Sequence, residues 1–134
     1  MTKPTAELAC RDMVTGLRIT VDGSVQKVEM PKNAILAGLY AAIGCDAVDV
    51  VRLADQSDMW IDDEGLYNSQ ANPLATKLAH HFQHDIPPRY RQPYFGTAVF
   101  LGINQNTGET LTMLGAAELT GAELTQLHSV LQHA

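Results

Sequence analysis

The chain has 134 residues, 46% of them hydrophobic and 18% charged, and this length and composition suit one compact globular domain rather than two. The 9 Lys and Arg against 15 Asp and Glu give a formal net charge of −6 at pH 7, which argues against a protein that coats nucleic acid, because such binding needs clustered basic residues. No apolar run reaches the length of a membrane-spanning helix or follows the pattern of a secretory signal, and two isolated cysteines, Cys10 and Cys45, form neither a disulfide scaffold nor a zinc module. We therefore expect a cytoplasmic protein without membrane contact.

The first half of the chain predicts a hairpin, a helix and two further strands. Residues 1–15 are expected to form an arm or a short helix, and residues 16–134 a single domain. Asp22–Gly23 favours a two-residue hairpin turn, because both central positions of a primed turn need positive φ. Apolar residues then recur at helical spacing, and Gly44 supplies a left-handed residue at the helix end. The predicted elements are strands Gly16–Val21 and Ser24–Met30, a helix Asn33–Ile43 with an apolar stripe of Ile35, Leu36, Leu39, Tyr40 and Ile43, a strand Cys45–Leu53, a turn Asp55–Asp58 and a strand Met59–Asp62.

The second half predicts two helices around a second hairpin. Asn72 is a favourable N-cap, and Pro73 fits the first position of the helix that follows. The next segment is apolar on both faces, which is typical of a central strand. The predicted elements are helix Asn72–His84, strands Tyr94–Ile103 and Glu109–Leu114, and helix Thr120–Gln132. The order ββαββαββα predicts an α+β domain with a mainly antiparallel sheet and about three helices.

Several segments together resemble a known family. They are the early hairpin, the strand Ala47–Leu53, the turn Asp62–Gly65, the segment Asn72–Thr76 (Asn-Pro-Leu-Ala-Thr) and the strand Gly96–Gly102. The family they resemble is the domain of unknown function three-eight-four-six, and the resemblance covers roughly Arg18–Leu119. It brings no catalytic residues. It implies a small protein of bacteria, phages or mobile elements, a setting in which accessory proteins often bind host factors.

The acidic excess of the chain lies in one segment, Asp46–Glu64. That segment holds seven acids and one base, Arg52, while the remaining acids and bases cancel. Grouped carboxylates can steer a basic partner, imitate the charge of nucleic acid or hold Mg²⁺ or Ca²⁺, and single Asp residues also favour solvated turns. The residues expected to contact a partner are Asp58, Trp60, Asp62, Asp63 and Glu64, followed by Arg89 and Tyr90.

Two further groups of residues suggest chemistry. The segment Pro87–Phe95 interleaves arginine with aromatic residues, which is typical both of surfaces that stack single-stranded bases and of protein interfaces. We favour an interface, because the wider basic footprint is missing. His80 and His84 stand four residues apart on the predicted helix, so their imidazoles could share a metal ion, or they could complement the helix dipole. No nucleophile signature or phosphate-binding loop occurs, and we expect no cofactor.

The sequence favours a non-enzymatic accessory protein of a phage or mobile element that uses its acidic patch to contact a host or mobile-element protein with a basic surface. Interference with host defence is one version of this function. Two alternatives stay open: a metal-dependent hydrolase or nuclease using the acidic turn or His80 and His84, and a single-stranded nucleic-acid-binding module using Arg89–Phe95. We expect a monomer, or a homodimer formed through an exposed strand edge.

Overall fold

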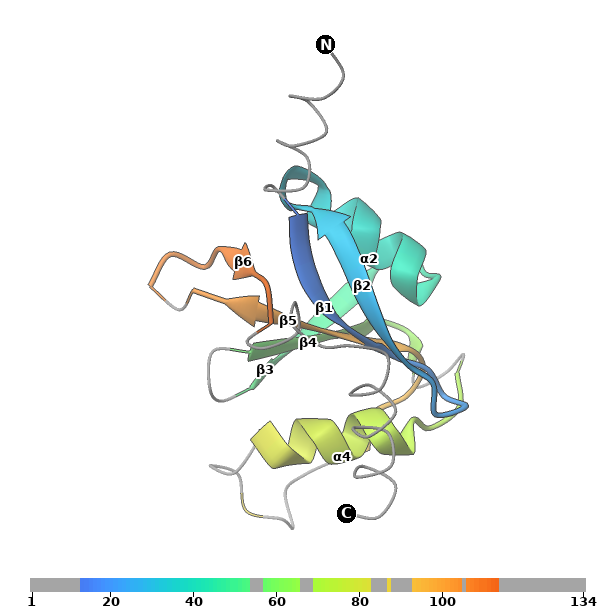
Figure 1. Ribbon diagram of the computed structural model, residues 1–134. Helices are drawn as coiled ribbons and strands as arrows, with labels where there is room; N and C mark the ends of the chain where they lie inside the picture. The colour runs from blue at the N-terminus through green and yellow to red at the C-terminus, as the bar shows by residue number, and fades with distance from the viewer. Residues whose placement is uncertain are drawn as a thin grey trace.

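The computed structural model describes residues 13–53, 57–65, 69–82, 87, 93–104 and 106–113. The elements are β1 (Met13–Ile19), β2 (Val25–Pro31), the 3₁₀ helix η1 (Lys32–Ala34), α2 (Ile35–Ile43), β3 (Val48–Leu53), β4 (Ser57–Asp62), α4 (Pro73–Phe82), β5 (Ala98–Ile103) and β6 (Thr110–Leu111). The strands form one antiparallel sheet in the order β2-β1-β5-β4-β3, with β6 paired to β5, and α2 and α4 cover opposite faces (Figure 1). The antiparallel sheet of the predicted α+β fold is confirmed. The described residues contain two of the three predicted helices, while Thr120–Gln132 and residues 1–12 of the predicted arm lie outside them.

The β1–β2 hairpin turns through three residues, not the two predicted. Thr20 N donates to Ser24 O at 3.0 Å, and Gly23 N donates to Thr20 O at 3.0 Å. Gly23 has a φ of 93° and is the left-handed residue that closes a three-residue hairpin loop. β1 also begins at Met13, before the predicted start of the domain at residue 16.

One face of the sheet packs against α4 and holds the larger core. Alternate residues of a strand point to the same face, so Ile19, Met59 and Phe100 meet here from three strands, each fully buried. The helix contributes Leu74, Ala75, Leu78 and Ala79. Burial of each large apolar side chain contributes about 1.5–3 kcal/mol, so this layer is a major source of the stability of the fold.

The opposite face packs against α2. Leu39 is fully buried there among Val14, Met30, Val99 and Leu101. Gly38 allows this close packing, because a Cβ at that position would lie 2.7 Å from the Cβ of Met30. The predicted left-handed end of the helix is confirmed, with Gly44 at a φ of 82°. The predicted stripe is wrong at Leu36, which is 50% exposed.

Asn72 caps α4 as predicted and also ties the helix to two strands. Its Oδ1 accepts a hydrogen bond from Ala75 N at 3.1 Å, while Nδ2 donates to Ile19 O at 2.9 Å and to Gly96 O at 2.8 Å. The side chain is completely buried. Two segments that carry the family resemblance, 72–76 and 96–102, therefore meet through this one residue.

Two predicted boundaries are wrong for identifiable reasons. The predicted strand from Tyr94 begins only at Ala98, because Gly96 adopts a φ of 81° and turns the chain out of extended geometry. Phe95 instead forms an isolated bridge with Ala71. β4 begins at Ser57, so Asp58 belongs to a strand and not to the predicted turn.

Candidate functional site at the β3–β4 edge

β3 is the outermost strand of the sheet, and β4 separates it from the central strand β5 (Figure 1). The pair runs in antiparallel register from Val48 opposite Asp62 to Leu53 opposite Ser57. In the ranges that the structure describes, no strand pairs with the other side of β3. This edge of the sheet therefore presents backbone donors and acceptors that a further strand could use.

Five carboxylates gather where β3 begins and β4 ends, and we call this group the acidic end: Asp46, Asp49, Asp62, Asp63 and Glu64. All are exposed except Asp62, which is half-buried. Asp49, Asp62 and Asp63 form no ion pair with any described residue. The base of this segment, Arg52, lies three residues beyond Asp49, about 10 Å along the strand, and pairs with Asp58 instead.

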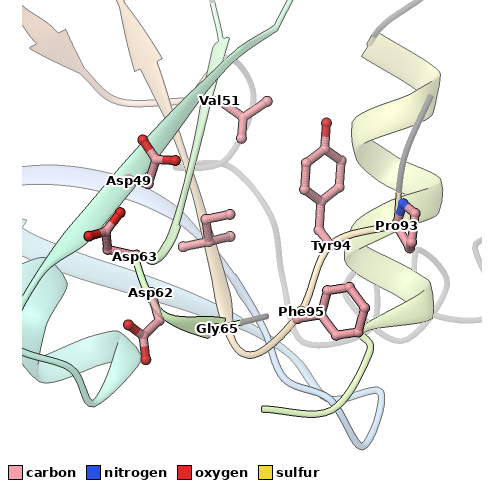
Figure 2. Close-up of a pocket in the computed structure, with 9 residues that line it drawn as sticks. Asp49, Val51, Asp62, Asp63, Gly65, Pro93, Tyr94 and Phe95 are labelled. Carbon is pink, nitrogen blue, oxygen red and sulfur yellow. The ribbon is translucent and has the colours of Figure 1, made fainter. Parts of the chain in front are cut away.

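A cavity of about 260 Å³ lies beside the acidic end on the α4 face, and we call it the edge cavity (Figure 2). Asp49, Val51 and Asp63 line its β3–β4 side, while Tyr94 and Phe95 form the opposite side. Carboxylates facing aromatic rings suit a cation carried on an apolar stem, such as a Lys or Arg side chain.

The aromatic side of the edge cavity is held firmly by the backbone. Asn72 N donates to Tyr94 O at 2.9 Å, and Tyr94 N donates to the hydroxyl of Thr76 at 3.0 Å. The ring of Tyr94 is only 5% exposed and makes an edge contact with the ring of His80, with centroids 6.4 Å apart. At Gly65, a Cβ would lie 2.9 Å from the carbonyl oxygen of Phe95, so glycine allows the β4 turn to approach this wall.

A second cavity, of about 220 Å³, lies at the C-terminal end of α2. It is lined by Cys45 together with Asp46, Asp62 and Glu64, so Asp62 borders both cavities. Burial raises the pKa of the Cys45 thiol, and the carboxylates of Asp62 and Asp46 raise it further. The thiol therefore stays protonated at neutral pH and is a poor nucleophile. The negative end of the helix dipole adds to the negative potential of the acidic end.

The structure separates Asp58 and Trp60 from the exposed acids. Both lie on the α2 face of β4; Asp58 is only 2% exposed and Trp60 is half-buried. Arg52 Nε lies 3.2 Å from Asp58 Oδ1, yet among the described residues neither this oxygen nor Trp60 Nε1 has a hydrogen-bond partner, although both atoms are buried. Burial raises the pKa of Asp58, and the Arg52 guanidinium partly opposes that rise. Of the predicted contact set, Asp58 is therefore buried, Trp60 and Asp62 are half-buried, and Asp63 and Glu64 are exposed.

Of the other predicted site residues, the structure describes only some. Arg89, Tyr90 and His84 fall on residues that are not described. His80 is half-buried beside Tyr94. In the described part of the chain, no three His, Cys, Asp or Glu side chains gather in a way that could hold a metal ion, and no helix there is long and apolar enough to cross a membrane.

Asp49, Tyr94 and Phe95 were not selected from the sequence as contacts of the acidic patch. The alternation of β3 carried part of the signal, because Asp49 and Val51 must share a face. The meeting of Phe95 with the β4 turn depends on the bridge between Phe95 and Ala71 and on Gly65, and no local pattern announces it.

Comparison with known proteins gives one family match. The sequence profile of the family described as Domain of unknown function (DUF3846) matches residues 14–121, which is most of the chain. No curated protein and no solved structure matches significantly.

Proposed function

We propose that this chain, which belongs to the DUF3846 family of domains of unknown function, is a non-enzymatic protein-binding module whose contact surface is the acidic end of its β3–β4 edge. The observation that carries the proposal is that Asp49 and Asp63, which form no ion pair with another described residue, line one cavity beside an open strand edge. Carboxylates placed in this way speed the encounter with a basic protein and disfavour acidic ones.

The partner that this charge favours is a protein with exposed Lys and Arg side chains. The phage and mobile-element setting implied by the family resemblance supports a protein of the host or of the element itself. Interference with a host defence protein is one version of the same contact.

The two other candidate functions draw no support from the described residues. A metal-dependent hydrolase or nuclease needs gathered ligands, and the described part of the chain offers no such group. A single-stranded nucleic-acid module needs exposed rings, whereas the ring of Tyr94 is buried in the core under α4.

The test compares two variants that change net charge equally. Asp49→Asn/Asp63→Asn removes two of the five charges of the acidic end, and Asp22→Asn/Glu29→Gln removes two exposed charges of the β1–β2 hairpin, whose β2 strand forms the opposite edge. We expect a labelled Lys-rich peptide, titrated by fluorescence anisotropy, to bind the first variant at least about tenfold more weakly than the unmodified chain, and with a smaller salt dependence. The second variant is expected to bind within about twofold of the unmodified chain. If both variants bind the peptide equally weakly, net charge alone determines the affinity, and the proposal is overturned.

A further inference from the structure

The register of the β3–β4 pair determines which backbone groups face the open edge. Asp63 N donates to Ala47 O at 3.0 Å, so the backbone of Ala47 faces β4. Successive residues of a strand direct their backbone groups to opposite sides, so Asp49 and Val51 also face β4, while Val48 and Val50 face outward. The open edge therefore offers outward N–H and C=O groups centred on Val50.

A side chain protects this edge in the free protein. The N–H of Val50 donates to Asp49 Oδ1 at 2.9 Å, so the carboxylate covers the outward donor at the middle of the edge. Charged side chains on edge strands are a common defence against uncontrolled pairing. A strand that replaces this bond would free the Asp49 carboxylate for another partner.

The charge of the edge selects its occupant. The β3 strand of a second copy carries one acid, Asp49, and one base, Arg52, so it brings no net positive charge to this acidic edge. An extended segment that carries Lys or Arg is complementary to Asp49 and Asp63, whose carboxylates form no ion pair with another described residue. A basic strand is therefore favoured over a second copy of this chain.

The edge cavity lies where a side chain of such a strand would point. An added strand would run about 4.8 Å from β3, with every second side chain on the α4 face. The residue opposite Asp49 would form a non-hydrogen-bonded pair with it, in which Cβ atoms lie about 4.5–5.5 Å apart. A Lys or Arg stem at that position reaches the space between Asp63 and Phe95, where carboxylates hold the charge and the ring covers the stem.

We propose that an extended segment with Lys or Arg at alternate positions adds as a strand to the outer edge of β3 and places one of these side chains in the edge cavity. This inference rests on the proposed function and specifies its partner: a basic strand, bound through main-chain hydrogen bonds for affinity and through one cationic side chain for specificity.

The test uses a peptide of alternating Lys and Thr and two isomers of it, one N-methylated on the Thr residues and the other on the Lys residues. An antiparallel added strand directs the Thr N–H groups toward β3 and the Lys N–H groups away. We expect the Thr-methylated isomer to bind at least about tenfold more weakly than the parent peptide and the Lys-methylated isomer within about twofold of it. Loss confined to either isomer supports strand addition, and its identity gives the direction of the added strand. Equal binding by both isomers, or equal loss in both, overturns the inference.

The same titrations separate this inference from the proposed function. If both isomers bind like the parent and Asp49→Asn/Asp63→Asn still weakens all three peptides, the acidic surface stands and strand addition fails. If the acidic variant binds the parent peptide as well as the unmodified chain does, the proposed function itself fails. Asp22→Asn/Glu29→Gln serves as the matched control in each titration.

Discussion

At the scale of single residues, Asp58 is a carboxylate buried within β4, and its burial affects stability. Its raised pKa means that burial disfavours the charged form more than Arg52 stabilises it. Because a folded-state pKa above the ordinary value of 3.8 makes the folded state the tighter proton binder, this group lowers stability at neutral pH. That contribution is relieved as the pH falls through the raised pKa toward the ordinary value.

Replacing Arg52 is expected to increase the destabilisation caused by the buried Asp58 charge. Arg52→Gln leaves the Asp58 charge buried without its counter-ion, and should lower the free energy of unfolding at pH 7 by about 1–2 kcal/mol. Urea denaturation at pH 7 and near pH 4 checks this, because protonation of Asp58 should shrink the deficit at the lower pH. Asp58→Asn in the same background should restore stability at pH 7. A deficit that is equal at both pH values would show that Arg52 acts through packing alone.

Asn72 gives a second prediction at this scale. Asp is as good an N-cap as Asn, but a carboxylate cannot donate to the carbonyl oxygens of Ile19 and Gly96. Asn72→Asp should therefore lower the free energy of unfolding by about 2–4 kcal/mol, at least as much as Asn72→Ala does. Thermal denaturation of both variants tests this. An Asp variant as stable as the unmodified chain would show that Asn72 stabilises the fold only as a helix cap.

At the scale of elements, Gly16 in β1 leaves no room for a side chain against β5. A Cβ there would lie 2.1 Å from Phe100 O and 2.5 Å from the Leu101 side chain, so a methyl group must push β1 and β5 apart. Gly16→Ala should cost about 3 kcal/mol, toward the upper end of overpacking effects. Gly108→Ala is the control, because its φ of 78° is strained for alanine but nothing lies within 4 Å, and it should cost about 1 kcal/mol. Similar losses in both variants would contradict the close approach.

The elements themselves were largely predictable because their signals are local. Asn72 followed by Pro73 predicts the start of α4, the apolar run predicts that β5 is central, and Gly44 predicts the end of α2. The structure confirms all three. Tertiary effects account for the errors. The aspartates of segment 55–58 favour a turn in isolation, yet pairing with β3 and β5 draws Asp58 into β4, and Gly96 divides the strand predicted from Tyr94.

The candidate site was predictable only in part, since it is assembled from distant segments. The concentration of acids between 46 and 64 was visible in the sequence, and the structure gathers five of them at one end of a strand pair. The aromatic wall at Tyr94 and Phe95 comes from some thirty residues further along. Its position depends on hydrogen bonds to Asn72, just before α4, and to Thr76 within α4, which pattern alone does not specify.

At the scale of the whole molecule, charge is distributed unevenly, and this should affect stability. Asp49 and Asp63 share a face of the β3–β4 pair without a described counter-ion, so they repel one another. Asp49→Asn/Asp63→Asn should raise the free energy of unfolding by about 0.5–1 kcal/mol at low salt, and the gain should fade near 1 M salt, where the Debye length is about 3 Å. Chemical denaturation across salt concentrations checks this; a gain that is independent of salt would mean that the substitutions act through something other than charge repulsion.

We propose that the same uneven charge determines where a partner binds. Titration of the ¹⁵N-labelled chain with the alternating Lys and Thr peptide, followed by amide chemical shifts, locates the contact directly. We expect the largest shifts at Val48, Asp49 and Val50 of the outer strand and at Phe95 across the edge cavity, with little change along β2 at the opposite edge. Shifts centred on β2, or spread evenly over the surface, would contradict a binding site at the β3–β4 edge.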